Sequence, residues 1–267
     1  MPEGPECRTD ALFLNEHLAG QQILSIELGD HHGRLDRYLE LLSSLISATI
    51  LQVGVYGKKI FFRFLLPNQS LLYAVVSYRM EGRFRLNEIP RYTWLVFRFA
   101  DFFLSYSDHR YMGEFQICLE EEVQRILSTL GPDILVMDLS WEYYNHLLVR
   151  KANVGICYFL LDQANVAGIG NYLKCDILYA CGINPHKKMS QLTPEQVLCL
   201  YQAMHEISRR AFADGACTLG TYKQINGRHG GYSRLVYGRE VDITGQYRVI
   251  RETIGGRGTY WCPEIQV

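Results

Sequence analysis

The sequence predicts an α+β protein of two domains, an N-terminal β-sandwich with flanking helices and a C-terminal helical domain that ends in a β-hairpin. Three observations support this prediction. Strand-like segments follow one another at short spacing before residue 108, helical signals dominate from about Val123 to Gly215, and a glycine-rich turn separates two strand-like segments near the C-terminus. A chain of 267 residues can form one large or two modest domains. We place the domains at residues 1–127 and 128–267.

The first predicted element is a helix. Its apolar face repeats with the helical period and consists of Cys7, Ala11, Leu14 and Leu18. Pro2 and Pro5 suit the non-helical entry to this helix, and Gly20 suits its exit.

Strands are predicted next. They are rich in aromatic and β-branched residues and span Lys59–Leu66, Leu71–Tyr78, Trp94–Phe99 and Phe102–Ser107. Several strands at this spacing are typical of a sandwich or a barrel. The sequence LGPD at 130–133 then indicates a linker turn.

The second half is predicted to be helical until its last segment. Thr193, Pro194 and Gln196 indicate a capping box with proline at the first helical position. Strand-like residues at 247–253 and 259–262 flank the glycine-rich turn 255–258, which predicts a β-hairpin.

The charge of the chain is nearly balanced, with 27 Lys and Arg, 28 Asp and Glu, and a net charge of −1. This weighs against nucleic-acid binding, because a phosphate-binding surface should be basic. The charges are uneven, however. Residues 1–57 contain eight acidic and three basic residues, whereas residues 201–267 contain nine basic and six acidic ones. The last third can therefore present a positive face.

Eight cysteines are scattered without Cys-x-x-Cys spacing, which predicts neither a zinc knuckle nor a thioredoxin-type site. Thiols without a disulfide framework indicate a reducing compartment. The first ten residues, MPEGPECRTD, lack the basic and apolar regions of a signal peptide, and no apolar run is suited to span a bilayer. We therefore expect a soluble intracellular protein.

Pro2 and its acidic neighbours form a candidate catalytic group. Removal of Met1 would leave Pro2 with a free secondary amine. An α-amino group with a pKa of about 7.7–8 is partly neutral and nucleophilic near neutral pH. Glu3 and Glu6 lie beside it in sequence and could transfer protons. The simpler interpretation is an ordinary helix start, where acidic residues interact favourably with the helix dipole.

Five segments, in order along nearly the whole chain, resemble the Fpg/Nei family of DNA glycosylase/AP lyases. They are residues 1–6 (MPEGPE), 56–59 (YGKK), 108–113 (DHRYMG), 160–173 (LLDQANVAGIGNYL) and 236–239 (VYGR). The third resembles the family's DNA-intercalation loop, and the fourth resembles its helix–two-turns–helix motif. A dinucleotide-binding loop at 168–173 is excluded, because the sixth position is Leu173 and a helix is expected before it.

The resemblance implies a mechanism in which Pro2 is the first residue of the mature protein and its nitrogen attacks C1′ of the damaged nucleotide. Glu3 would assist ring opening and proton transfer, and Glu6 is a possible further group near the base. Lys58 would contact the phosphate beside the lesion and assist proton transfer, with Lys59 as the alternative in register. Alone, Lys58 would be taken as a solvated lysine at a strand edge. β-Elimination and δ-elimination would follow without a cofactor.

The resemblance also implies DNA contacts. The void-filling residues would be Met80, Arg110 and Met112, and the phosphate-binding residues Asn171 and Arg257. Amides at the helix start beside Asn171 would hold backbone oxygens. The family often has Phe where this chain has Met112, and Arg where it has Tyr111. The plainer interpretations are core packing for the methionines, a helix cap for Asn171 and a solvated turn residue for Arg257. The segment Thr218–Gly231 would approach the flipped base.

Many family members bind zinc through four cysteines in a C-terminal finger, here about residues 235–267. Only Cys262 remains in this chain, and the other ligand positions are Val241, Thr244 and Ile265, which do not coordinate zinc. The hairpin must then be held by cross-strand and apolar contacts. This finger is similar to the zincless finger of the Nei-like (endonuclease VIII-like) enzymes of eukaryotes and giant viruses.

That similarity implies base excision repair of oxidised pyrimidines, formamidopyrimidines or hydantoins rather than 8-oxoguanine. The partner would be damaged DNA, double- or single-stranded, bound by a monomer without metal or membrane, in the nucleus or another DNA-containing compartment. Two alternatives stay open. A damage-recognition module would keep the DNA contacts but retain Met1, so that Pro2 is a tertiary amide. A metal-dependent nuclease would need a carboxylate–histidine cluster, which the sequence lacks.

Overall fold

The computed structural model describes residues 2–136, 139–218 and 224–267. The chain divides into two compact units. The first consists of Met1–Pro2, Glu6–Thr129 and Thr218–Gly230, and the second of Glu3–Pro5, Leu130–Cys217 and Gly231–Val267. The chain therefore passes from one unit to the other at several points, not only near residue 127. Within the described ranges, no helix combines the length and apolar character needed to cross a bilayer.

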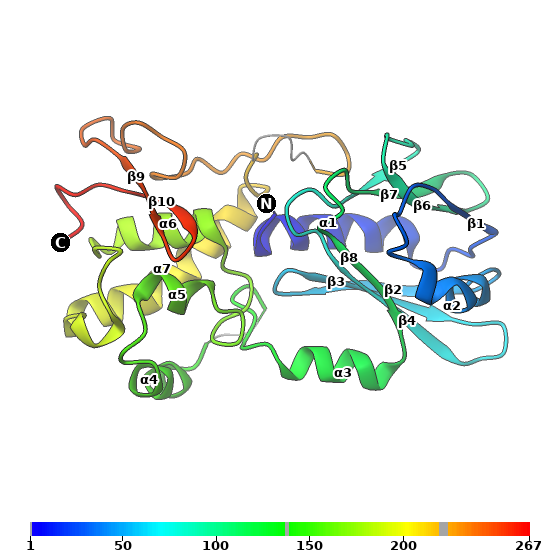
Figure 1. Ribbon diagram of the computed structural model, residues 1–267, viewed down its shortest axis with the longest axis horizontal. Coiled ribbons are helices and arrows are strands. Elements are labelled where there is room, and N and C mark those ends of the chain that lie inside the picture. Colours follow the sequence, from blue (N-terminus) through cyan, green and yellow to red (C-terminus); the bar gives the residue numbers. More distant parts are fainter. Residues whose placement is uncertain (1, 137–138, 219–223) are drawn as a thin grey trace. The chain divides into compact units, whose positions relative to one another are not determined.

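The first unit contains two four-stranded sheets, with strand orders β1–β6–β7–β5 and β2–β3–β4–β8 (Figure 1). Neighbouring strands are antiparallel. The strands are β1 Ser25–Leu28, β2 Thr49–Tyr56, β3 Lys59–Leu65, β4 Leu71–Ser77, β5 Arg83–Leu86, β6 Thr93–Arg98, β7 Phe103–Ser107 and β8 Glu114–Cys118. The helices are α1 Gly4–Leu18, α2 Leu39–Ser44 and α3 Glu120–Ser128, with a 3₁₀ helix at Asp36–Tyr38.

Strand β4 shows how alternation in the sequence builds the layers. Leu72, Ala74 and Val76 point into the core that both sheets share with α1. Tyr73 and Val75 point to the other face, where they pack with residues of α3. Because both faces of β4 are covered, its apolar run is continuous.

The predicted first helix is confirmed as α1, and its predicted apolar face is buried in the shared core. The four predicted strands correspond to β3, β4, β6 and β7. The prediction missed the other four. Strands β1 and β5 have only four residues each, β2 contains Gln52 and Gly54, and β8 carries Glu114 and Gln116. These segments are short or are interrupted by polar residues or glycine, so they lack the longer apolar runs on which the prediction depended.

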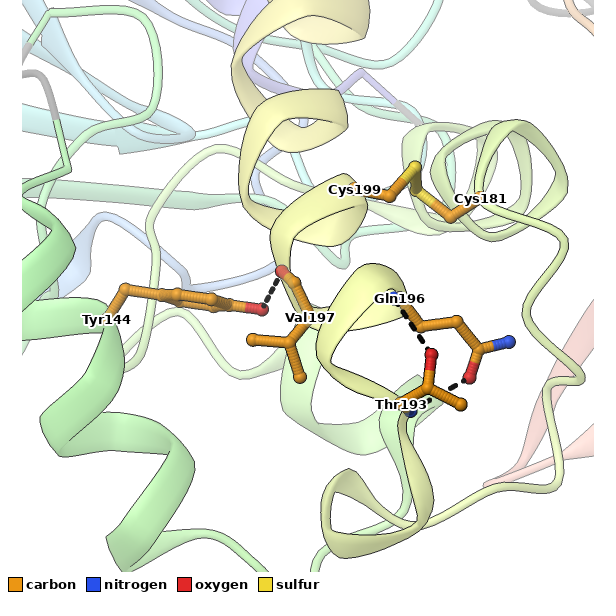
Figure 2. The surroundings of a disulfide bond; sticks show 6 residues. All are labelled: Tyr144, Cys181, Thr193, Gln196, Val197 and Cys199. Carbon is orange, nitrogen blue, oxygen red and sulfur yellow. Dashed lines mark hydrogen bonds between the residues drawn. A yellow bond between two sulfur atoms is a disulfide. The ribbon is translucent and has the colours of Figure 1, made fainter.

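The second unit is mainly helical. Its helices are α4 Trp141–Arg150, α5 Ile156–Leu161, α6 Asn171–Ala180 and α7 Pro194–Ala213, with a 3₁₀ helix at Met189–Gln191. A hairpin of β9 Ile250–Ile254 and β10 Arg257–Trp261 closes it. The predicted capping box of α7 is confirmed: the Gln196 N–H donates to Thr193 Oγ1 (3.2 Å), and the Thr193 N–H donates to Gln196 Oε1 (3.3 Å) (Figure 2). The α+β prediction is confirmed.

A disulfide joins Cys181, directly after α6, to Cys199 in α7, with Cα atoms 5.6 Å apart (Figure 2). Close by, the Tyr144 hydroxyl donates to the Val197 carbonyl oxygen (3.2 Å) and ties α4 to the first turn of α7. The expectation of cysteines without a disulfide framework was wrong for this pair, because sequence spacing does not show which helix faces meet. The other six cysteines, all within the described residues, form no disulfide and are buried.

The segment 224–230 belongs to the first unit, although it follows the helices of the second. The reason is Ile225, which is buried in the core of the sheets. Residues 219–223, which belong to the segment expected near the flipped base, lie outside the described residues, as does Met1.

Candidate functional site

The Glu3 carboxylate binds the start of helix α6. Glu3 is buried, and its Oε2 accepts the backbone N–H of Gly170 (2.8 Å) and of Leu173 (3.3 Å), while Oε1 accepts that of Tyr172 (2.8 Å). The Gly4 N–H also donates to the Gly168 carbonyl oxygen (2.9 Å). A carboxylate at a helix N-terminus satisfies free amides and interacts favourably with the helix dipole. These bonds fix the residue that follows Pro2.

The contact between Glu3 and the start of α6 is so close that it leaves no room for a side chain at position 170, which explains the glycine there. A Cβ atom at Gly170 would lie 2.2 Å from Cδ of Glu3 and 2.5 Å from its Oε1. The motif predicts that the glycines and amides of this corner approach a DNA phosphate. In the structure three of these amides instead bind Glu3, because an acidic side chain from the N-terminal segment occupies them.

Lys58 lies at the tip of the β2–β3 hairpin. Tyr56 pairs with Lys59, so that Gly57 and Lys58 form a two-residue turn, and Gly57 has a positive φ of 58° that suits glycine. The Cys7 thiol of α1 lies 3.8 Å from the Lys58 carbonyl oxygen. The hairpin tip is therefore packed against the first turns of α1, close in sequence to Pro2. Glu6, on the same helix, is fully buried.

The side chain of Lys59, the alternative in register, contacts residues of strands β4 and β8. Its Nζ donates to Ser77 Oγ (3.2 Å) and lies 3.5 Å from Glu114 Oε2. Arg79 also pairs with Glu114. Burial favours a raised pKa for Glu114, but the Arg79 and Lys59 contacts outweigh it and lower the pKa. The Lys59 ammonium group therefore forms an ion pair with Glu114 of the same sheet.

The loop at 108–113 is a fixed turn. Asp108 is buried, and its carboxylate accepts the backbone N–H of Arg110 (2.9 Å) and of Gly113 (2.5 Å). Tyr111 has a positive φ of 51°, stacks on Trp94 and donates its hydroxyl to Asp30 (2.8 Å). Together these contacts hold a strained turn in one shape.

Two side chains of this fixed turn face solvent. Met112 is 51% exposed, and the Arg110 side chain is 52% exposed. Core packing is therefore excluded for Met112. Met80 lies half-buried after β4, next to Arg79, whose φ is 51°. An exposed apolar side chain on a rigid loop can enter a base stack without losing much conformational freedom.

Asn171 is the first residue of α6, and both polar atoms of its side-chain amide form hydrogen bonds. Its Nδ2 donates to the Gly258 carbonyl oxygen of β10 (2.8 Å), and its Oδ1 accepts from Lys174 Nζ (2.9 Å). Lys174 also donates to Thr259 Oγ1 (2.7 Å). Helix α6 and the hairpin are thereby joined by a short chain of polar bonds.

Lys174 was not predicted as a site residue. It is fully buried, and among the residues that the structure describes both its hydrogen-bond partners are neutral and no carboxylate lies within ion-pair distance. Lysine is seldom fully buried without an acidic partner, because a buried charge is costly. Such a charge suits a neighbouring anion. Its position three residues after Asn171 on a helix was the available signal.

Asp176, also buried on α6, binds the segment at the start of the finger. It accepts the backbone N–H of Leu235 (3.0 Å) and Val236 (3.1 Å) and the hydroxyl of Tyr232 (3.0 Å). Burial raises the pKa of Asp176, and these hydrogen bonds oppose that rise. The segment VYGR is therefore anchored by a helix residue that the sequence comparison did not single out.

Arg257 is exposed at the start of β10. It pairs with Ile254, so the turn is only Gly255–Gly256, with φ of 61° and 72°. The predicted turn 255–258 was two residues too long, because two glycines with positive φ already complete a tight hairpin. Gly258 and Thr259, which follow Arg257, are the residues that bind Asn171 and Lys174.

Two family descriptions match the chain. "Formamidopyrimidine-DNA glycosylase N-terminal domain" matches residues 1–115, and "Formamidopyrimidine-DNA glycosylase H2TH domain" matches residues 130–223. The formamidopyrimidine-DNA glycosylase of Lactobacillus gasseri is 30% identical over 280 residues, which cover 100% of this chain and 99% of the relative. That of Bacillus anthracis is 33% identical over 206 residues, 73% of this chain and 74% of the relative.

Solved structures agree with these matches. The Lactococcus lactis Fpg in complex with DNA containing an abasic site superimposes with a TM-score of 0.88 at 28% identity, over 99% of both chains. The wild-type protein of the same species with DNA containing N7-benzyl-Fapy-dG gives the same TM-score, 0.88, at 28% identity. The relatives named here are bacterial Fpg proteins, whereas the sequence motifs had suggested the Nei-like enzymes of eukaryotes and giant viruses.

Proposed function

Because this chain belongs to the formamidopyrimidine-DNA glycosylase (Fpg) family, and is thus a DNA N-glycosylase and AP lyase that binds damaged DNA, we propose that it removes oxidised bases through a Schiff base on Pro2. Strand cleavage by β- and δ-elimination follows. The observation that carries the proposal is the anchoring of Glu3 to the start of α6, directly beside Pro2 in the chain.

The Pro2 nitrogen is the nucleophile once Met1 is removed. Its lone pair attacks C1′ of the damaged nucleotide, the bond from C1′ to the base breaks, and the base leaves with a proton supplied by an acid. The Pro2 nitrogen loses its own proton, and the C1′–O4′ bond then breaks as O4′ is protonated, which opens the sugar ring and leaves an iminium between Pro2 and C1′. The resulting iminium makes the C2′ proton acidic, so that its removal expels the 3′ phosphate, and a second elimination expels the 5′ phosphate.

Glu3 and Lys58 are the proton-transfer residues in this proposal. The three amides fix Glu3, which follows Pro2 in the chain, so that its carboxylate needs no reorganisation during the reaction. Lys58, on a tight hairpin packed against α1, is the proposed cation for the phosphate beside the lesion, because the segment YGKK resembles the family segment that carries this lysine. Glu6, buried on α1, has a possible further role near the base.

DNA binding in this proposal combines phosphate contacts with a wedge. Asn171 and Arg257 bind phosphates, and the buried Lys174 adds positive charge next to Asn171. Met80, Arg110 and Met112 fill the space of the extruded base, whose unstacking costs a few kcal/mol. The exposure of Arg110 and Met112 on a fixed loop supports this role.

Replacing Arg257 by alanine is expected to weaken DNA binding and to reduce the slope of log K against log salt by about 1, since one phosphate contact is lost. Fluorescence anisotropy at several salt concentrations measures both quantities. Arg248→Ala, a change of another exposed finger arginine, is the matched control. An unchanged slope in Arg257→Ala would contradict the phosphate contact.

Lys174→Met is expected to weaken DNA binding about tenfold while changing the free energy of unfolding by no more than about 2 kcal/mol, because the gain from removing a buried charge opposes the loss of the hydrogen bonds to Asn171 and Thr259. Lys174→Arg keeps the charge and is expected to bind nearly normally. Anisotropy and urea denaturation distinguish the two effects. Equal DNA binding by Lys174→Met and the wild type would show that the buried charge does not act on DNA.

We propose that the C-terminal finger works without zinc and is of the Nei-like type. Of the four ligand positions only Cys262 has a metal-binding side chain, and it is buried in an apolar cluster with Cys175, Val236 and Val249. Burial raises the pKa of the Cys262 thiol to about 11, so the thiolate that zinc needs is disfavoured. Metal analysis of the purified chain tests this: one zinc per chain would contradict it.

The substrates proposed are formamidopyrimidines and oxidised pyrimidines. The solved relatives bind DNA with Fapy-dG-type lesions or an abasic site, which supports the first class. The Nei-like finger supports the second. Excision from matched duplexes that carry one lesion each ranks them, and a clear preference for 8-oxoguanine would contradict the proposal. The protein would act in a DNA-containing compartment.

Borohydride trapping tests the proposed function directly. The Met-trimmed protein is incubated with an oligonucleotide that contains an oxidised pyrimidine, and a covalent adduct at the Pro2 peptide is expected by mass spectrometry. Tight binding to this oligonucleotide without any adduct would overturn the Schiff-base mechanism.

A further inference from the structure

The loop of the finger that contains two of the lost zinc positions is ordered by a carboxylate. This loop, residues 241–247, includes Val241 and Thr244, whose side chains cannot bind zinc. Between them lies Asp242, which is 1% exposed. A buried carboxylate needs several hydrogen bonds to offset its lost hydration.

Asp242 has four such bonds. Its Oδ1 accepts the backbone N–H of Gln246 (2.9 Å) and of Tyr247 (3.1 Å). Its Oδ2 accepts the hydroxyls of Thr244 (2.7 Å) and Tyr179 (2.6 Å). Three of the donors belong to the loop itself, and the fourth comes from helix α6. One side chain thus closes the loop and attaches it to α6.

The backbone of the loop agrees with this closure. The Asp242 N–H donates to the Tyr247 carbonyl oxygen (3.0 Å), and the Gly245 N–H donates to the Asp242 carbonyl oxygen (3.0 Å). Gly245 has a positive φ of 75° and open space around it, so the turn is tight without crowding. A metal ion in a zinc knuckle has the same structural role, because its ligands fix the loop around one centre.

We propose that Asp242 takes the place of the zinc ion in this finger and positions the β9–β10 hairpin, and with it Arg257, for DNA. The loop leads directly into the hairpin: Tyr247, held by Asp242, precedes β9 by three residues. Tyr247 and Tyr260 pack on the cluster of Val249 and Cys262. Asp242 is a positioning residue, and this role rests on the proposed function of Arg257.

Two substitutions separate this role from simple loss of charge. Asp242→Ala removes all four acceptor contacts, whereas Asp242→Asn can keep the two amide contacts through Oδ1 and donate from Nδ2 to the two hydroxyl oxygens. DNA affinity is expected to fall about tenfold or more in Asp242→Ala and to stay within about threefold of the wild type in Asp242→Asn. Glu240→Gln, on an exposed side chain two residues away, is the charge control.

A double-mutant cycle tests the link to Arg257. If Asp242 acts by positioning Arg257, Asp242→Ala should weaken binding little further in the Arg257→Ala background. Hydrogen exchange supplies a readout independent of DNA: Asp242→Ala should speed exchange at 240–262, and the peptides of the β-sheets should exchange as in the wild type. A zinc chelator should change neither binding nor exchange.

Three results would overturn the proposal: wild-type exchange in the finger of Asp242→Ala, fully additive effects of Asp242→Ala and Arg257→Ala, or loss of binding in Asp242→Asn equal to that in Asp242→Ala. None of these results would contradict the Schiff-base mechanism, because that mechanism is tested separately by borohydride trapping at Pro2. If Arg257→Ala binds normally, the proposed phosphate contact fails, and the exchange experiment still decides whether Asp242 orders the finger.

Discussion

An N-terminal extension that leaves Pro2 inside a peptide bond is expected to reduce base excision and strand cleavage by at least about a thousandfold, because a tertiary amide nitrogen has no nucleophilic lone pair. A protein with retained Met1 belongs to this class. Pro2→Ala, which loses the secondary amine, is likewise expected to lose trapping of abasic DNA. The measurement is single-turnover cleavage together with borohydride trapping.

The matched control carries the same extension at the C-terminus. Val267 is exposed, so the added residues should leave cleavage unchanged. DNA binding by anisotropy should be similar for both proteins, since the phosphate contacts are retained. Normal cleavage by the N-terminally extended protein would eliminate Pro2 as the nucleophile. Binding without cleavage in the Met-trimmed wild type would instead favour a damage-recognition module.

Gly170→Ala is expected to have the second largest effect, because the new methyl group would overlap the Glu3 carboxylate at 2.2 Å from Cδ. Glu3 must move away, and the amides of α6 lose their acceptor. We expect a loss of about 2–4 kcal/mol in the free energy of unfolding, from overpacking and unsatisfied amides. Excision of a damaged base is expected to fall at least about a hundredfold, measured in single turnovers.

Gly54→Ala is the control for this substitution. Gly54 lies in β2 without a positive φ, and a Cβ atom added there would meet open space, so a methyl group should be tolerated. Trapping of a pre-formed abasic site should fall less than base excision in Gly170→Ala, since the base has already left. Excision at the wild-type rate by Gly170→Ala would show that the Glu3 position is not critical.

Local patterns in the sequence were sufficient for much of the fold. The period of α1, the capping box at Thr193 and the glycines of the last hairpin each depend on neighbouring residues, and the structure confirms them. Short strands with polar residues, such as β8, were missed because their burial depends on partners far away in the chain.

The candidate site likewise contains residues that the sequence could predict and contacts that it could not. Short motifs made Pro2, Asn171 and Arg257 candidates by resemblance, since these residues belong to contiguous segments. The partners of those segments could not be read from the sequence. That Glu3 binds amides more than 160 positions away, and that Lys174 connects Asn171 to Thr259, are consequences of packing.

Contiguous stretches of the chain specify the family motifs and the change from a strand-rich first half to a mainly helical second half. Which polar groups meet depends instead on the folded arrangement, as for Glu3 with α6, Cys181 with Cys199, and Asp242 with Tyr179. The difference arises because secondary structure follows from local periodicity and turn chemistry, whereas a buried charge or thiol is defined by the groups that folding brings around it.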